Sequence, residues 1–115
     1  MTDALKLCEQ NKDKKIEHII SNIRGVILFK QKNYELAKTE FIKSINKDKK
    51  FIDPHKNLFK VHLKLKNFKS AILNALNIIE LDSTNNPLSF FNLALAYDLD
   101  KNFKKAIEIY KKLKL

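Results

Sequence analysis

The chain has 115 residues, of which 44% are hydrophobic, and 23 basic against 13 acidic residues give it a formal net charge of +10. That length allows one domain with its own core, while a single glycine and two prolines leave little material for hairpin turns or phosphate-binding loops. The lone Cys8 excludes an intrachain disulfide, and no segment approaches the roughly 18 apolar residues of a membrane span, so we expect an all-helical, soluble, cytoplasmic protein.

The first segment with helical spacing is short. Residues 3–10 carry a narrow apolar stripe made of Ala4, Leu5 and Cys8, and the polar run 11–15 follows it. Apolar residues three and four apart lie on one face of a helix. The segment therefore predicts one leading helix and a turn.

The next stretch predicts a pair of helices, one over 16–31 and one over 34–46. Gly25 falls inside the first, where glycine costs about 1 kcal/mol relative to alanine, so it indicates close approach of a neighbouring helix. The expected inner faces consist of Ile20, Ile23, Ile27 and Leu28 in the first helix and of Tyr34, Ala37, Phe41 and Ile45 in the second.

Two further pairs of helices follow. Asp53-Pro54 predicts a helix start, because aspartate caps free amides and proline suits the first helical position. That helix should end near residue 66, with a partner from residue 68. Asn86-Pro87 repeats the start signal. It opens a helix over 88–100 and a last one from residue 103.

A short motif, Asn-aromatic-x-x-Ala, marks the second helix of each pair. Its copies end at Ala37, Ala71 and Ala106, which are 34 and 35 residues apart. Periods of this length are typical of helical solenoids. Ala4 lies 33 residues before Ala37. We therefore divide one domain, residues 1–115, into a partial leading repeat (1–15) and three repeats (16–50, 51–84 and 85–115).

The aligned pairs resemble tetratricopeptide repeats. The resemblance extends over residues 18–115, and its implied fold is a right-handed α-solenoid of about three helical hairpins. Pentatricopeptide repeats are the nearest rival, but the small residues Gly25 and Ala94 suit the tetratricopeptide pattern better. The matching positions are Gly25, Leu28, Tyr34, Ala37, Phe41 and Ser44; Leu58, Ala71 and Ala75; and Phe90, Leu93, Ala94, Tyr97, Phe103, Ala106 and Tyr110.

The resemblance implies a concave groove, lined by the first helix of each hairpin, that binds an extended peptide or a partner helix. Carried over position by position, the groove would be lined by Ile19, Asn22, Val26 and Phe29; by Lys56, Asn57, Lys60 and Lys64; and by Leu88, Phe91, Asn92 and Leu95.

Three of these residues carry the functional hypothesis. Lys56, Lys60 and Lys64 are spaced at i, i+4 and i+8 and share one helical face. Like charges at this spacing repel, a local cost that can mark a binding face, although lysines often only solvate a helix. If the row binds, its ligand should be an acidic segment. Asn57 could hold a ligand backbone amide, and Phe29, Phe91 and Leu95 could hold apolar groups at its ends.

One tetratricopeptide subgroup holds acidic chaperone tails in a two-carboxylate clamp of lysines, asparagines and an arginine. Only Asn57 stands at a matching position here. Asn22, Val26, Leu88 and Asn92 occupy other clamp positions, so we expect no chaperone-tail binding.

Other function classes remain as alternatives or are set aside. Nonspecific nucleic-acid binding would use lysines of the second helices, yet only one basic residue is arginine, the usual side chain for bidentate phosphate contacts. The lysine content is also what a nucleotide-composition bias would produce. Self-association through the third repeat and Leu113 is a further possibility. His55 and His62, about 10.5 Å apart along a helix axis, are too far apart to share one metal ion. We expect no enzyme activity and no cofactor. The basic side chains of the second helices are Lys38, Lys43, Lys69, Lys104, Lys105, Lys111 and Lys112.

Overall fold

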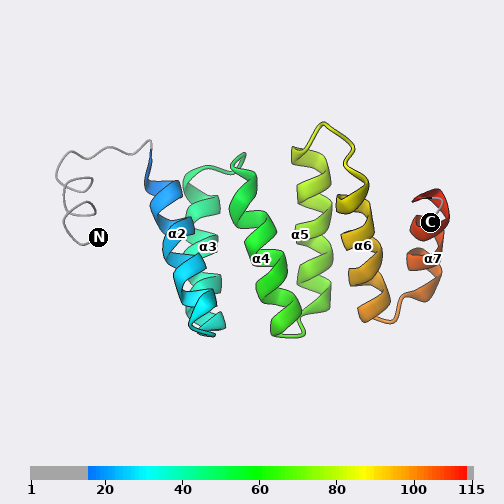
Figure 1. Cartoon of the computed structure of the whole chain (residues 1–115), viewed down its shortest axis with the longest axis horizontal. Helices are drawn as coiled ribbons and strands as arrows, with labels where there is room; N and C mark the ends of the chain where they lie inside the picture. Colours follow the sequence, from blue (N-terminus) through cyan, green and yellow to red (C-terminus); the bar gives the residue numbers. More distant parts are fainter. Residues whose placement is uncertain (1–15, 114–115) are drawn as a thin grey trace. The chain divides into compact units, whose positions relative to one another are not determined.

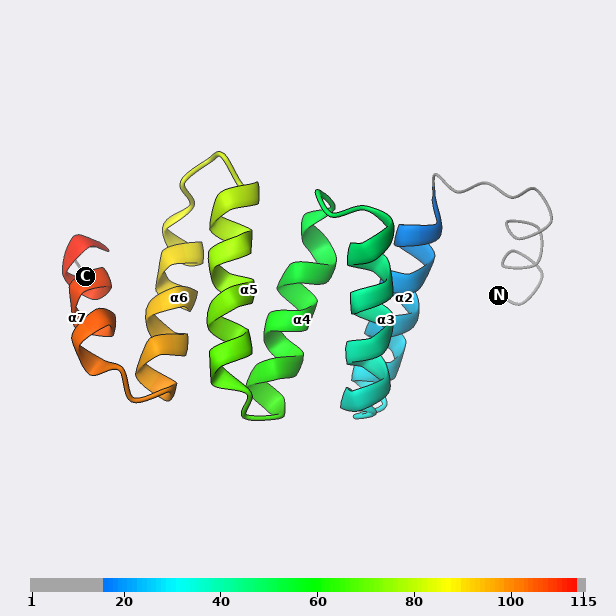
Figure 2. The same cartoon turned by 180° about the vertical axis from the view of Figure 1, so that it is seen from behind.

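A computed structural model describes residues 16–113 of the chain, and every regular element in that range is an α-helix (Figures 1 and 2). The predicted all-α class is confirmed. The leading helix expected within 1–15 lies outside the described residues. The helices are α2 (Glu17–Lys30), α3 (Tyr34–Lys47), α4 (Ile52–Lys64), α5 (Phe68–Leu81), α6 (Pro87–Leu99) and α7 (Phe103–Leu113).

The chain forms two compact units, Met1–Pro54 and His55–Leu115. Unit 1 contains α2 and α3, which pack together as a hairpin. Unit 2 contains α4 from its second turn onward, together with α5, α6 and α7. Each unit is described by itself below. None of the helices within 16–113 combines the length and the apolar character that crossing a bilayer requires.

The two predicted helix starts fared differently. Asn86 is the N-cap of α6, as expected: its side-chain oxygen accepts the Leu88 N–H at 3.0 Å, and Pro87 takes the first helical position. The start predicted at Asp53 is wrong, because α4 already begins at Ile52. Pro54 is tolerated inside the first turn, since amides there have no intrahelical acceptor and none is lost.

The interior of unit 1 is built around one aromatic ring. Phe41 of α3 is fully buried, and a Cβ added at Gly25 of α2 would lie within 2.8 Å of three of its ring carbons. The close approach of a second helix predicted from Gly25 is confirmed. Nearby, Ser44 on α3 donates its hydroxyl to the backbone carbonyl of His18 at 2.6 Å, which adds a polar tie between the two helices.

The inner face predicted for α2 is partly wrong. Ile23 and Ile27 are 47% and 36% exposed, while Ser21, Asn22 and Gly25 are buried. Apolar residues occur on nearly every side of this helix, so their period does not select one face. The choice is made by the notch at Gly25, which admits the Phe41 ring and turns the small side chains toward α3.

Unit 2 has a core in which small residues predominate on the second helices. Ala71 and Ala75 of α5 and Ala106 of α7 are buried, which lets neighbouring helix axes approach closely. His55 and His62 of α4 are buried as well. Within 16–113 no three His, Cys, Asp or Glu side chains group as a metal site. The remaining large core residues are Leu58, Phe59, Val61, Ile72, Ile78 and Leu93.

All three hairpin turns share one backbone arrangement. Lys32, Lys66 and Lys101, each directly after the C-cap residue, have φ values of 63°, 60° and 65°. In each turn this lysine and the asparagine after it donate their N–H groups back to carbonyls of the last helical turn. This is the Schellman motif, which usually has glycine at the left-handed position. Lysine adopts that conformation at a cost of roughly 1–2 kcal/mol.

Glycine at these three positions is therefore expected to stabilise the protein. Lys32→Gly, Lys66→Gly and Lys101→Gly should each raise the free energy of unfolding by about 0.5–1 kcal/mol, because relief of the strained φ outweighs the entropy that glycine adds to the unfolded chain. Urea denaturation measures the change. Lys60→Gly, within α4, is the matched control, and it should destabilise by about 1 kcal/mol.

Candidate interaction surface

The first helix of unit 2 presents the three predicted lysines as a row, which we name the lysine row (Lys56, Lys60 and Lys64). All three side chains are exposed on α4. Within the part of the chain that the structure describes, neither Lys60 nor Lys64 forms an ion pair. Two cationic groups thus stand on one helix face without a neutralising carboxylate.

Lys56, at one end of the row, lies in the field of a carboxylate. Asp82, the C-cap of α5, accepts the Thr84 hydroxyl at 2.6 Å and the Thr84 N–H at 3.0 Å. These bonds, with a smaller Coulombic contribution from Lys56, lower the pKa of Asp82 below its usual value. Asp82 is therefore fully ionised near neutral pH, and Lys56 is the most compensated member of the row.

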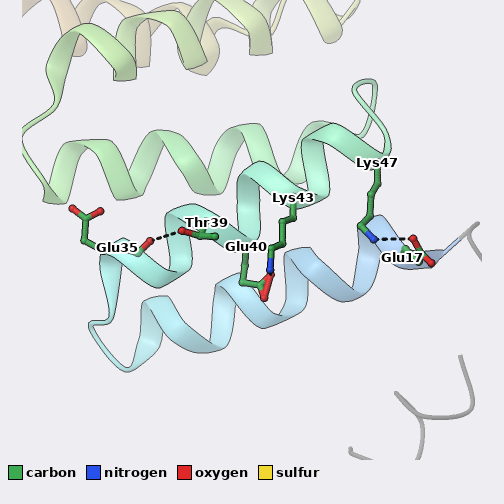
Figure 3. A network of polar contacts seen from close by, with 6 residues as sticks. All are labelled: Glu17, Glu35, Thr39, Glu40, Lys43 and Lys47. Atoms are coloured by element: carbon green, nitrogen blue, oxygen red, sulfur yellow. Dashed lines mark hydrogen bonds and ion pairs between the residues drawn. The ribbon is translucent and has the colours of Figure 1, made fainter. Parts of the chain in front are cut away.

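Several lysines on the second helices are paired, in contrast to the row. Lys38 meets Glu35 at 3.0 Å, and Lys69 meets Asp100 at 3.3 Å. Figure 3 shows two further pairs in unit 1, Lys43 with Glu40 at 3.9 Å and Lys47 with Glu17 at 2.7 Å. Exposed pairs of this kind add little stability, but they reduce the free positive charge that the second helices offer to an anion.

On α6, apolar side chains take the place of the lysines. The positions equivalent to the lysine row, 35 residues later, are Phe91, Leu95 and Leu99; we name these the α6 apolar row. Phe91 and Leu99 are exposed and Leu95 is half-buried. The Phe91 ring rests against Tyr110 of α7, with centroids 5.9 Å apart and planes tilted by 57°. That contact fixes the aromatic group while leaving one side open.

Leu99 was missed by the sequence analysis. The repeat interval supplies the signal, because Leu99 lies 35 residues after Lys64 and so takes the equivalent position on α6. Leu88, in contrast, was predicted and is the most exposed side chain of the predicted α6 set, whereas Asn92 is half-buried. On α4, Asn57 is also half-buried.

The predicted residues of α2 belong to unit 1. Ile19 is exposed, Val26 and Phe29 are half-buried, and Asn22 is buried. The Phe29 ring meets Tyr34 edge-on, with centroids 5.3 Å apart. The contact holds the Phe29 side chain at the end of the hairpin. Asn22 lies mostly beneath the surface, so it offers little side chain to a ligand.

Within unit 2, the arrangement joins two kinds of recognition. Equivalent positions of successive repeats face the same side of a helical stack, so the lysine row and the α6 apolar row belong to one side of unit 2. The amines can attract carboxylates, and Phe91, Leu95 and Leu99 can bury apolar groups beside them. This side of unit 2 therefore offers both charged and apolar groups.

Comparisons with known proteins agree with this fold. The sequence model described as tetratricopeptide repeat matches residues 88–114, a stretch that covers α7 and all of α6 except Pro87. Among curated proteins, none matched the chain in a sequence comparison.

Solved structures with the same fold include the first and the second TPR of Spaghetti (RPAP3), each bound to the HSP90 peptide SRMEEVD. The first is 18% identical with a TM-score of 0.74, and the match covers 84% of this chain and 76% of that one. The second is 22% identical with a TM-score of 0.74, covering 92% and 94%.

A third similar structure is the MamA RS-1 ArsTM double mutant, 24% identical with a TM-score of 0.79; the match covers 95% of this chain and 60% of that one. The last hairpin matches the tetratricopeptide repeat model, and the whole fold is similar to that of solved TPR structures. The protein is therefore a helical-repeat protein whose fold resembles that of tetratricopeptide repeat proteins.

Proposed function

We propose that the protein is an interaction scaffold that binds an acidic segment of a partner protein on the first-helix side of unit 2. The single observation that carries the proposal is the lysine row, three exposed amines at regular spacing of which two have no ion-pair partner within the described residues. Repulsion among them is relieved when a ligand supplies carboxylates.

The spacing of the row defines the ligand more closely. Residues four apart rise about 6 Å along a helix, so the three amines span about 12 Å. An extended peptide advances about 3.3–3.6 Å per residue. Acidic side chains at alternate positions of an extended ligand, or at every fourth position of a helical one, would therefore match successive lysines.

The α6 apolar row sets a second requirement. Phe91 and Leu99, which take the positions equivalent to Lys56 and Lys64, are exposed. An apolar ligand side chain that packs on them would gain about 25 cal/mol of binding free energy for each Å² removed from water. Charge alone gives a salt-sensitive and poorly selective contact. An apolar anchor would supply affinity that persists at physiological ionic strength.

The similar structures support a peptide ligand. Both Spaghetti TPR structures hold a peptide, SRMEEVD, which contains two glutamates and an aspartate. The same fold thus binds this peptide in two domains of another protein. Because the chaperone clamp is expected to be missing here, the proposed ligand of this protein is an acidic segment with apolar ends rather than that tail.

Peptide titration tests the proposal. A fluorescent peptide with glutamate at three alternate positions and leucine or phenylalanine at both ends is expected to bind, and its glutamine counterpart to bind at least tenfold more weakly at about 0.1 M salt. A helical version with glutamate at every fourth position distinguishes the two ligand shapes. Equal binding of the acidic and neutral peptides contradicts the proposal.

Nucleic acid serves as the competing ligand in the same assay. A basic surface that binds phosphates nonspecifically loses affinity steeply with added salt and treats unrelated RNA and DNA alike. Lys38, Lys43 and Lys69 already pair with carboxylates on or beside the second helices, which favours the peptide. Tighter binding of unrelated oligonucleotides than of the acidic peptide would reverse that preference.

A further inference from the structure

One face of α7, the last helix of unit 2, is exposed, whereas the equivalent face of α5, the second helix of the preceding hairpin, is largely buried. Counting from the recurring alanines, Phe103 and Ile107 of α7 correspond to Phe68 and Ile72 of α5. Ile72 is 8% exposed and Phe68 half-buried, whereas Ile107 and Phe103 are 51% and 55% exposed. The same repeat position is thus core in one helix and open surface in the other.

The covering element can be identified by comparing the neighbours of the two helices. α3 packs on α2, and α7 packs on α6, the first helix of its own hairpin. α5 also packs against α6, the first helix of the following hairpin, and Figures 1 and 2 show α5 between α4 and α6. The burial that Ile72 has and Ile107 lacks therefore comes from a following first helix.

The chain contains one first helix whose matching face is open. Aligned with α6, the residues Ile20, Ile23 and Ile27 of α2 correspond to Ser89, Asn92 and Ala96. Ala96 is completely buried and Ser89 nearly so, whereas Ile27 is 36% and Ile23 47% exposed. On α2 this face is also more apolar than its counterpart on α6, because isoleucine stands at all three positions.

From these two faces we infer that copies of this chain associate head to tail, with Phe103 and Ile107 of α7 packing against Ile20, Ile23 and Ile27 of α2 in a second copy. The contact repeats between chains the α5–α6 junction within unit 2. Because it joins two different faces, it is heterologous, and each copy uses each face once. The inference is independent of the proposed peptide site.

Residues 3–10 are the other candidate for the α2 face, since they are expected to be the second helix of a leading repeat. Their equivalents of Phe103 and Ile107 are Met1 and Leu5. A second copy offers Phe103 and Ile107 at the positions that Met1 and Leu5 take in residues 3–10 and their neighbours. Docking of that copy also removes its exposed α7 face from water. The copy is therefore the occupant that accounts for both exposed faces.

The net charge gives the association a recognisable salt dependence. Two copies with a formal charge of +10 each repel at low ionic strength, and salt screens that repulsion over a Debye length of about 10 Å at 0.1 M. Contacts driven by apolar burial survive the screening. Association should therefore strengthen with added salt, whereas peptide binding by the lysine row should weaken.

Sedimentation equilibrium at protein concentrations of about 10 µM to 1 mM measures this association. The range is high because the contact joins only one helix face on each copy, and small interfaces associate weakly. We expect the average mass to exceed that of the 13.5 kDa monomer and to rise with concentration and with salt. Phe103→Gln with Ile107→Gln, and separately Ile23→Gln with Ile27→Gln, should each give a monomer. Leu36→Gln with Leu73→Gln, at two other exposed leucines, should leave the association unchanged.

Mixing the two monomeric variants completes the test, because each retains the face that the other has lost. A one-to-one mixture should form a dimer and nothing larger. A monomeric wild-type chain at every concentration overturns the inference. Continued association of the variant Ile23→Gln with Ile27→Gln also overturns the inference. It would mean that α7 pairs with a surface other than α2, such as α7 of a second copy, as it would have to if residues 1–15 cover α2. Circular dichroism confirms that each variant remains helical.

Discussion

Replacing Lys56, Lys60 and Lys64 together with glutamate is expected to weaken binding of the acidic peptide by about 10- to 100-fold at 0.1 M salt, a loss of about 1–3 kcal/mol for three exposed charge pairs. Attraction becomes repulsion at each position. The fold should persist, because all three side chains are exposed on α4 and only Lys56 lies in the field of a carboxylate, that of Asp82. Fluorescence anisotropy measures the affinity, and circular dichroism the helix content.

The control variant must distinguish the effect of the lysine row on peptide binding from the effect of the net charge. Reversal of Lys104, Lys111 and Lys112 on α7 also changes three exposed lysines. Each replacement lowers the net charge by two, so both triple variants fall from +10 to +4. The α7 variant should bind the peptide within about threefold of the wild type, because its charges lie on other positions and are screened by salt. Equal losses in the two variants would show that net charge alone attracts the ligand.

Gly25→Ala is expected to be the most damaging single-methyl change in unit 1. The added Cβ would meet the ring of Phe41, which is itself buried and cannot swing away. Overpacking of this kind costs about 1–3 kcal/mol, against about 1 kcal/mol gained from the better helix propensity of alanine. Urea unfolding should show a net loss of up to about 2 kcal/mol.

A double-mutant cycle identifies the cause. Phe41→Leu removes the ring carbons nearest to Gly25 and destabilises on its own by leaving space in the core. With Phe41→Leu already present, Gly25→Ala should cost less than it does in the wild type, giving a coupling free energy of about 0.5–3 kcal/mol. Strictly additive effects would show that Gly25 is required for another reason. Ala37 of α3, also buried, is not changed in any of these variants.

The parts of the fold that the sequence predicted well are those in which neighbouring signals agree. Ala37, Ala71 and Ala106 gave the period, and Asn86-Pro87 placed the start of α6. The face of α2 was harder to predict. Its isoleucines surround the helix, so the pairing of Gly25 with Phe41, a contact between residues distant in sequence, decided which side is buried. Periodicity within one helix contains no information of that kind.

The turns and the candidate site show two other limits. A left-handed residue at the end of a helix is usually predicted from glycine, but at Lys66 the residue is lysine. The sequence therefore does not reveal the turn, although its backbone hydrogen bonds are those of a Schellman motif. At the site, the lysine row could be named from spacing alone, since exposure follows from charge. Leu99 could be named only from the repeat interval, because the exposure of an apolar residue does not follow from its chemistry. The peptide role of the row stays a prediction.

The sparse packing of α7 has a consequence for motion. Among its described residues only Ala106 is buried, whereas α5 buries Ala71, Ile72, Asn74, Ala75 and Ile78. Segments with few buried contacts detach at lower free energy than the rest of a domain. Within unit 2, we therefore expect α7 to detach at lower free energy than α5 and α6. Each opening frees Tyr110 from Phe91, so the local unfolding of one helix changes the support of a side chain on the next.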